Sequence, residues 1–125
     1  MTELLKFSKL SVNIKPMSDM NLKQISSTEL KKLLEQEKTD LCLIDVRTPE
    51  EYSRGHLKDS QNIPLDILLE QDPHISKDRP VVVYCLSGSR SILAATALIS
   101  MQYKQVMNLE KGLLEWRFLK YPETT

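Results

Sequence analysis

The residue types from which a reactive thiol site can be built cluster in one short segment, Tyr84-Cys85-Leu86-Ser87-Gly88-Ser89-Arg90. A β-branched apolar run precedes Cys85, and a helix-like segment follows Arg90. A loop that enters a helix turns several amide N–H groups inward and lies beside the positive end of the helix dipole. With the hydroxyls of Ser87 and Ser89 and the charge of Arg90, those donors would lower the pKa of the thiol and stabilise a thiolate or a persulfide. We therefore expect Cys85 to be a nucleophile.

Because free cysteines are often buried and inert, an unreactive Cys85 in a strand-to-helix turn is the alternative that spacing alone leaves open.

The elements that must position this loop alternate between short apolar runs and helix-like segments, which is typical of βαβ units around a mostly parallel sheet. Strands are predicted at Leu22–Ile25, Leu41–Val46, Ser60–Ile63, Val81–Tyr84 and Gln105–Leu109. Helices are predicted from Ser26 to about Glu37, and at Pro49–Tyr52, Leu65–Leu69, Ser91–Met101 and Leu113–Leu119. Ligands of such sheets bind at the carboxyl ends of the strands, which is where Cys85 falls. The fold class expected is α/β.

Composition sets bounds on the function. The 125 residues fit one ordinary domain, and 17 basic residues balance 17 acidic ones, so no overall field favours nucleic acid or an anionic membrane. No apolar run reaches the length of a membrane helix. The two cysteines, Cys42 and Cys85, show neither a disulfide framework nor a zinc spacing, so we expect a cytoplasmic protein. Residues 1–20 are expected to form either an accessory hairpin or arm, or a poorly ordered extension.

The loop Cys85–Ser91 resembles the Cys-x-x-Gly-x-Arg-Ser active loop of rhodanese-homology domains. Asp45-Val46-Arg47 with Pro49–Leu57 resembles that family's first signature, and Leu109–Trp116 resembles its C-terminal one. The resemblance spans Leu22 to Tyr121, which places a rhodanese-like domain at residues 21–122. It implies a five-stranded parallel sheet with helices on both faces. It also implies transfer of a sulfane sulfur through a Cys85 persulfide, without metal or organic cofactor.

In this resemblance the donor is thiosulfate or a small persulfide, and the acceptor is cyanide or a thiol such as that of thioredoxin. The residues expected to bind the donor are Leu86, Ser87, Gly88, Ser89 and Arg90. Supporting roles are expected for Asp45, Arg47, Glu51 and His56: the first two pair to fix loop geometry, Glu51 pairs with Arg47, and His56 hydrogen-bonds a nearby loop. Trp116 is expected to fill the core and Cys42 to pack within a strand.

Two departures from the family pattern bear on the substrate. Leu86 is apolar where efficient thiosulfate enzymes often carry a cation, so we expect thiosulfate to be a poor donor. Lys111-Gly112 replaces a usual pair of glycines, so the turn there is expected to differ slightly and to project a lysine near the rim of the site.

Two other functions stay open. A phosphatase or arsenate reductase would use a similar anion-binding cysteine loop, but those of the His-Cys-x5-Arg type have five residues between cysteine and arginine, whereas four separate Cys85 from Arg90. A non-catalytic interaction or regulatory module is the second, since one fold hosts many functions. Retention of Cys85 and Arg90 favours the enzyme.

Overall fold

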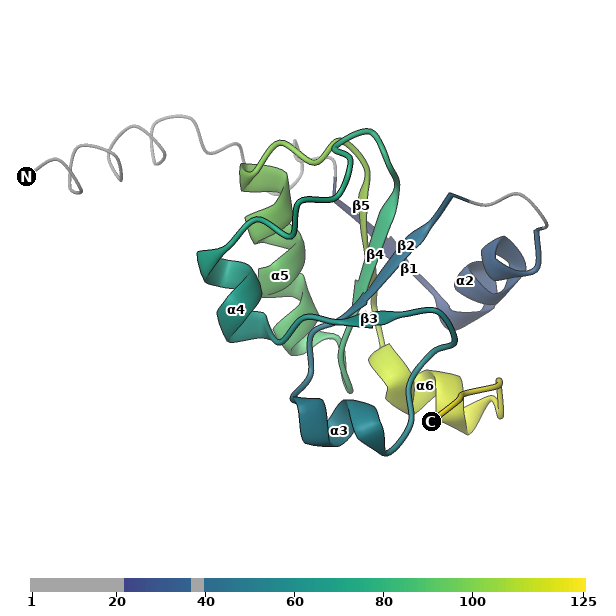
Figure 1. Ribbon diagram of the computed structural model, residues 1–125. Coiled ribbons are helices and arrows are strands. Elements are labelled where there is room, and N and C mark those ends of the chain that lie inside the picture. The colour runs from purple at the N-terminus through teal and green to yellow at the C-terminus, as the bar shows by residue number, and fades with distance from the viewer. Residues whose placement is uncertain (1–21, 37–39) are drawn as a thin grey trace, which may run out of the picture.

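A five-stranded parallel sheet forms the centre of the computed structural model, which describes residues 22–36 and 40–125. Its strand order is β1-β5-β4-β2-β3 (Figure 1). The strands are β1 (Leu22–Ile25), β2 (Cys42–Asp45), β3 (Gln61–Asn62), β4 (Val81–Tyr84) and β5 (Val106–Leu109). All four residues of β2 and of β4 are buried, and all except Asp45 are apolar, as a parallel sheet covered on both faces requires. The predicted fold class is confirmed.

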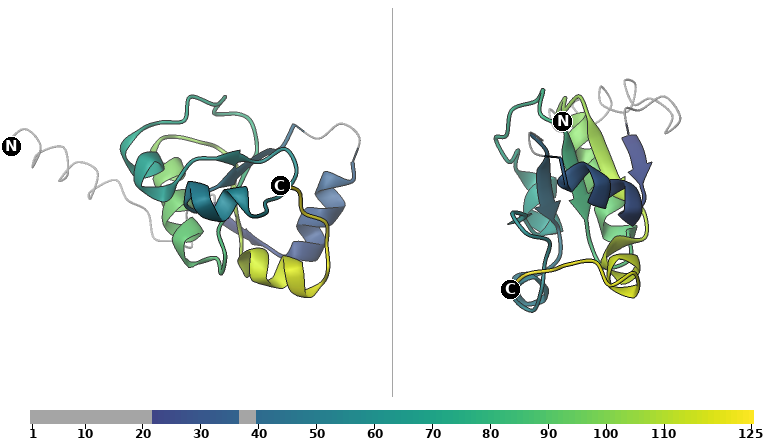
Figure 2. Two further views of the ribbon diagram at one scale, coloured as in Figure 1. Left: turned by 60° about the horizontal axis from the view of Figure 1, so that its bottom comes forward. Right: turned by 90° about the vertical axis from the view of Figure 1, so that its right-hand side faces the viewer.

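Helices cover both faces of the sheet. They are α2 (Ser27–Leu34), α3 (Pro49–Ser53), α4 (Leu65–Glu70), α5 (Ser89–Ser100) and α6 (Gly112–Phe118). Helices α4 and α5 lie on one face and α2 and α6 on the other, while α3 lies beyond the carboxyl ends of the strands (Figures 1 and 2). Two buried clusters result, one under α5 with Leu98 at 0% exposure and one under α6 with Trp116 at 2%.

Side-chain caps define where α2 and α3 begin. The hydroxyl of Ser26 accepts from the amide of Glu29, and the Glu29 carboxylate accepts from the amide of Ser26. Thr48 and Glu51 make the same reciprocal pair at the start of α3. These capping boxes satisfy amides that the first helical turn leaves unpaired. The helix predicted to begin at Ser26 therefore has its N-cap at that residue.

The predicted elements agree with the structure apart from their ends. Helix α2 ends at Leu34, short of the predicted end near Glu37, because its apolar spacing stops there and polar residues follow. Helix α5 begins at Ser89, two residues before the predicted start, since Gly88 adopts a left-handed conformation that places Ser89 in the first turn. The hairpin or extension expected at 1–20 lies outside the described residues.

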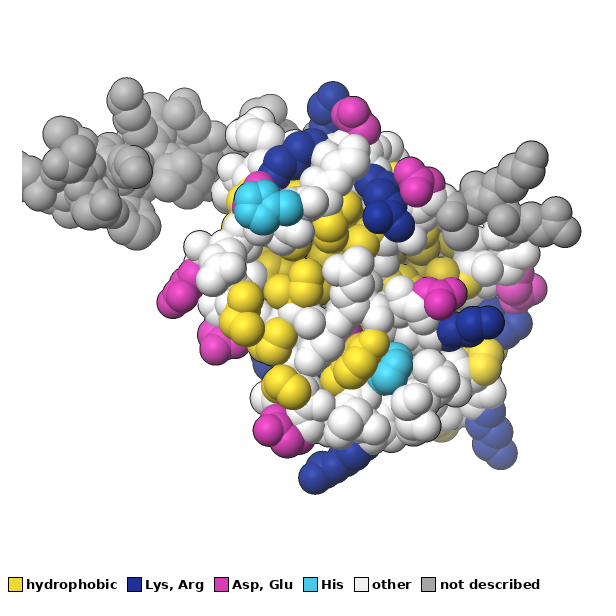
Figure 3. Space-filling model, in the orientation of Figure 1, with side chains coloured by type: hydrophobic (Ala, Val, Ile, Leu, Met, Phe, Trp, Pro, Cys, Tyr) yellow, Lys and Arg dark blue, Asp and Glu magenta, His cyan; other side chains and the backbone are white. Residues whose placement is uncertain are grey.

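The surface carries charges of both signs. On the face drawn in Figure 3, Lys and Arg side chains lie among Asp and Glu side chains, and hydrophobic side chains gather near α4. Ile67 and Leu69 of α4 are 45% and 50% exposed. This mixture agrees with the formal net charge of zero. None of the helices within the described ranges is long and apolar enough to cross a membrane.

Candidate active site

Cys85 lies directly after β4, and its side chain is fully buried. Its Sγ accepts a hydrogen bond from the amide of Gly88 at 3.1 Å. The amide and the hydroxyl of Ser91 both donate to the same atom at 3.4 Å. The loop Cys85–Gly88 and the first turn of α5 thus surround one sulfur atom with N–H and O–H donors, as a site for a sulfur anion requires.

The environment of Cys85 favours the thiolate. Burial alone raises the pKa of the Cys85 thiol, but hydrogen bonds from Ser91, and then from the amides of Gly88 and Ser87, outweigh it and lower the pKa below its ordinary value. The thiol also lies at the N-terminus of α5, where the helix dipole favours negative charge. The buried Cys42 thiol, in β2, has a pKa raised by burial instead. The pKa shifts of the two thiols are therefore opposite in direction, and only that of Cys85 favours the nucleophilic thiolate.

Two glycines give the Cys85 loop its shape. Gly88 has a φ of 98°, and a Cβ there would lie 2.0 Å from the carbonyl oxygen of Glu110. Gly112 has a φ of 61°, and a Cβ there would lie 2.3 Å from the carbonyl oxygen of Leu86. Neither position can hold a side chain without moving backbone. Lys111 has a φ of −106°, which any residue adopts, so only the second position of the usual glycine pair needs glycine here.

Helix α6 holds the loop from the other side. The amide of Leu113 donates to the carbonyl of Cys85, and that of Leu114 to the carbonyl of Leu86, both at 3.0 Å. These amides belong to the first turn of α6, which has no acceptors within its own helix. The C-terminal motif is thus linked to the active loop through the backbone, and Lys111 projects outward with its side chain 70% exposed.

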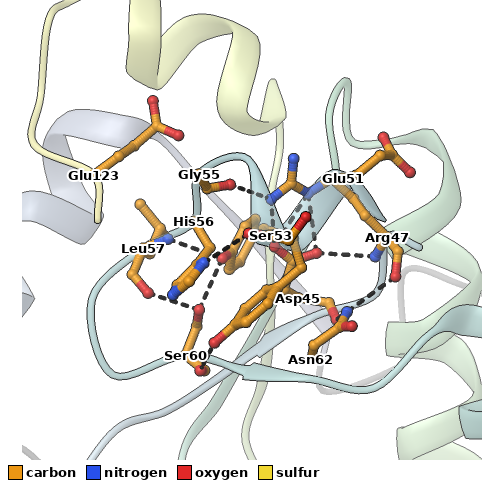
Figure 4. A network of polar contacts seen from close by, with 12 residues as sticks. Asp45, Arg47, Glu51, Ser53, Gly55, His56, Leu57, Ser60, Asn62 and Glu123 are labelled. Atoms are coloured by element: carbon orange, nitrogen blue, oxygen red, sulfur yellow. Dashed lines mark hydrogen bonds and ion pairs between the residues drawn. The ribbon is translucent and has the colours of Figure 1, made fainter. Parts of the chain in front are cut away.

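A buried ion pair anchors the loop after β2. The guanidinium of Arg47 donates to the carboxylate of Asp45, with Nη2 at 2.7 Å from Oδ2, and the two side chains are 2% and 0% exposed. The same Nη2 donates to the carbonyl of Gly55 at 2.6 Å, which ties the far end of α3 to the pair (Figure 4). The predicted pairing of Asp45 with Arg47 is what the geometry shows.

Glu51 pairs with Arg90, so the predicted pairing of Glu51 with Arg47 is wrong. Arg90 donates through Nη1 to Oε1 at 2.7 Å and through Nη2 to Oε2 at 3.0 Å. Arg47 is already engaged by Asp45 two residues earlier, while Glu51 in the first turn of α3 lies across from the first turn of α5. The ion pair therefore joins the two motif loops beside the thiol.

His56 serves the fold around α3. Its Nδ1 lies 2.8 Å from the carbonyl oxygen of Tyr52, and its ring stacks on the Tyr52 ring with centroids 3.6 Å apart. Its backbone exchanges hydrogen bonds with Thr124, so the C-terminal segment runs beside it (Figure 2). The predicted hydrogen bond of the His56 ring is present, but its partner is the last turn of α3 instead of a nearby loop. Trp116 is buried in the core as predicted, with Nε1 donating to the carbonyl of Pro122.

The sequence interpretation missed Ser91 as a contributor to the site. The hydroxyls of Ser87 and Ser89 lie 3.0 Å apart and hydrogen-bond to each other, whereas the hydroxyl of Ser91 donates to the sulfur. Binding of a donor by Leu86 to Arg90 stays a prediction. Within residues 22–36 and 40–125 there is no group of three or more His, Cys, Asp or Glu side chains arranged to hold a metal.

These features define an α/β domain with a thiolate-stabilising loop at the carboxyl edge of its sheet. A model of the rhodanese-like domain family matches residues 26–118, and the chain belongs to that family. A sulfurtransferase of Allochromatium vinosum is 39% identical over 77 residues, which cover 62% of this chain and 72% of that protein. A thiosulfate sulfurtransferase, GlpE, of Coxiella burnetii is 32% identical over 98 residues, covering 78% and 90%. The crystal structure of a rhodanese-related protein from Thermoplasma volcanium superposes with a TM-score of 0.73 at 26% identity, covering 82% of this chain and 97% of that one.

Proposed function

We propose that this protein is a sulfurtransferase that carries a sulfane sulfur as a persulfide on Cys85. One observation carries the proposal: the buried Sγ of Cys85 accepts hydrogen bonds from Gly88 and Ser91 that lower the pKa of the thiol. An inert core cysteine would gain nothing from such donors, and Cys42 has a raised pKa. The names of the Allochromatium and Coxiella relatives support the same reaction class.

The reaction has two displacement steps. The Cys85 thiolate attacks the outer sulfur of the donor, a sulfur–sulfur bond forms on Cys85, and the donor's own sulfur–sulfur bond breaks with its electron pair leaving on sulfite or on a thiolate. A cyanide ion or an acceptor thiolate then attacks the terminal sulfur of the persulfide. Thiocyanate or a new persulfide departs, and the Cys85 thiolate is regenerated. The transferred sulfur has the same oxidation level in the donor, in the Cys85 persulfide and in the product. The steps therefore need no external oxidant.

Phosphate or arsenate chemistry is less well supported. A tetrahedral oxyanion needs several donors directed at its oxygens, together with a cation over the loop. Here the donors converge on Sγ itself, and Arg90 is bound by both carboxylate oxygens of Glu51. Hydrolysis of p-nitrophenyl phosphate that disappears in Cys85→Ser would favour the phosphatase.

The test is intact-protein mass spectrometry after incubation with thiosulfate or with glutathione persulfide. We expect a gain of one sulfur atom, located on Cys85 by peptide mapping and absent from Cys85→Ser. Cys42→Ser is the matched control because Cys42 is also buried, and it should load like the wild-type protein. If the wild-type protein forms no adduct with either donor, the sulfurtransferase proposal is rejected and the interaction module takes its place.

The acceptor is proposed to be a thiol, with a thioredoxin-type protein as the first candidate. The loaded protein should lose its extra sulfur when reduced thioredoxin is titrated against it. Transfer of the sulfane sulfur to a thioredoxin thiolate would give a thioredoxin persulfide and regenerate the Cys85 thiolate. Attack by the second thioredoxin thiol would then release sulfide and leave thioredoxin as its disulfide. These products, together with retention of the Cys85 persulfide in buffer alone, would support this acceptor. If the loaded protein passes its sulfur to cyanide but not to thioredoxin, thioredoxin is rejected as the acceptor.

A further inference from the structure

We propose that the Glu51–Arg90 ion pair is a specificity-determining device that makes the site favour persulfide donors over the thiosulfate dianion. The inference rests on the proposed function and concerns the same site. It follows from the pairing of Arg90, the cation that the active loop itself supplies, with a carboxylate on a neighbouring motif. Thiosulfate carries two negative charges, whereas a persulfide group carries at most one, so the local charge separates the two donors.

The guanidinium of Arg90 has little freedom to leave Glu51. Each of its two terminal nitrogens donates to one carboxylate oxygen of Glu51, at 2.7 and 3.0 Å. This two-bond arrangement is the geometry of the strongest charge-assisted pairs. Glu51 is also held from its own side, since the amide of Thr48 donates to its Oε1 at 3.1 Å. The pair is only partly solvated, with the side chains of Arg90 and Glu51 38% and 28% exposed. An incoming dianion would have to displace a positioned carboxylate or lie beside it.

Arg90 and the thiol are close enough for their charges to interact. The negative charge of Cys85 contributes to the raised pKa of Arg90, after the larger contribution of the hydrogen bonds that Arg90 donates to Glu51. Glu51 therefore places its negative charge on the loop cation that interacts with the thiol. Its pKa is lowered to about 2, first by Arg90, so it stays ionised at neutral pH.

Two other cations of the motifs, Arg47 and Lys111, are also paired. Arg47 is engaged by Asp45 and by the carbonyl of Gly55. Lys111 lies 3.9 Å from Glu115. Leu86 adds an apolar side chain to the loop, half-buried against the core cluster that contains Trp116. Arg90, Arg47 and Lys111 are thus each paired with a carboxylate of the chain. The amide N–H and hydroxyl groups around Sγ are left to bind a sulfur-containing substrate of low charge.

The decisive experiment compares loading of Cys85 by thiosulfate and by the persulfide of 2-mercaptoethanol, which carries no charge outside its persulfide group, in Glu51→Gln. Glutamine at this position of α3 keeps the capping box with Thr48, so the helix start is preserved while the counter-charge of Arg90 is removed. We expect the ratio of thiosulfate to persulfide loading rates to rise about two- to fivefold, as for a partly exposed ion pair. Glu50→Gln is the matched control, because Glu50 is an exposed neighbour on the same helix, and it should leave the ratio unchanged.

A second substitution separates the freed charge from any structural effect. In Glu51→Gln/Arg90→Gln both charges are gone, so the ratio should return to within twofold of the wild-type value. A second measurement varies the salt concentration and can be made on the wild-type protein as well as on Glu51→Gln. Raising the ionic strength from about 0.01 to about 1 M shortens the Debye length from roughly 30 to 3 Å. Thiosulfate loading of the wild-type protein should change little, because its local charges cancel, whereas loading of Glu51→Gln should slow.

The inference is overturned if the ratio is unchanged in Glu51→Gln, if it rises equally in Glu50→Gln, or if the rise persists in the double variant. A steep fall of wild-type thiosulfate loading with salt would also overturn it. These results differ from failure of the proposed function, in which neither donor would load Cys85 in the wild-type protein.

Discussion

The hydroxyl of Ser91 lies 3.4 Å from the Sγ of Cys85 and donates a hydrogen bond to it from the first turn of α5. This bond is the first of the contributions that overcome the effect of burial and lower the pKa of the thiol. Removing it in Ser91→Ala should raise the pKa of Cys85 and slow persulfide loading at neutral pH about two- to tenfold, the range of one hydrogen bond. Titration of the ultraviolet absorbance of the thiolate, with Cys85→Ser as the blank, measures the change.

Ser100→Ala is the matched control for Ser91→Ala. Ser100 lies at the other end of α5, where its hydroxyl donates to the carbonyl of Thr96. This variant makes the same chemical change in the same helix without touching the sulfur. If both variants shift the titration of Cys85 equally, the Ser91 hydroxyl does not stabilise the thiolate.

The buried pair of Asp45 and Arg47 should be a major determinant of stability. Asp45→Asn keeps the size of the side chain but leaves the Arg47 guanidinium, 2% exposed, without its counter-charge. Breaking a buried pair from one side costs about 3–5 kcal/mol of unfolding free energy. Urea unfolding followed by circular dichroism measures the loss. Asp66→Asn, on the exposed side of α4, should stay within about 0.5 kcal/mol of the wild-type value. Equal stability of the two variants would contradict the anchoring role.

The positions of the strands and the place of Cys85 at the carboxyl end of β4 could be predicted from the sequence because both depend on local patterns. Val81–Tyr84 is a continuous β-branched and aromatic run, and Cys85 follows it directly. Gly88 likewise marks the turn, and its φ of 98° shows why a residue without Cβ is needed. Such signals need no knowledge of distant contacts.

The partners of side chains could not be predicted in the same way. Arg90 finds Glu51 across 39 positions, and the sequence offers Arg47 at a closer spacing. Only the packing of α3 against the start of α5 decides between them. The role of Ser91 was missed for a related reason. The predicted helix began at Ser91, whereas the observed one begins at Ser89, which places Ser91 in the first turn with its donors directed at the sulfur.

The Glu51–Arg90 pair should make the free energy of unfolding depend on pH between about 4.5 and 2. The pKa of Glu51 is about 2 in the folded protein against an ordinary value of 4.5. A lowered pKa gives stability that is fully present above about 4.5 and is lost as the pH falls toward 2. The difference in unfolding free energy between the wild-type protein and Glu51→Gln should therefore shrink across that window. Because the pair is partly exposed, the difference at neutral pH should be below about 1 kcal/mol. Urea unfolding at pH values through this window measures it, and a difference independent of pH would contradict the pairing.

The last prediction concerns the backbone contact between α6 and the active loop. A Cβ at Gly112 would lie 2.3 Å from the carbonyl oxygen of Leu86 and 2.7 Å from that of Cys85, at a φ of 61°. Gly112→Ala should therefore displace the loop and cost about 2 kcal/mol or more of unfolding free energy. It should also slow loading of Cys85, because the amide of Leu113 would no longer hold the Cys85 carbonyl at 3.0 Å. Lys111→Ala is the neighbouring control, since its φ of −106° already accepts a side chain, and both its stability and its loading rate should match the wild-type protein. Thermal unfolding and mass spectrometry of the two variants measure these effects. A Gly112→Ala protein as stable and as readily loaded as Lys111→Ala would show that the loop tolerates the shift.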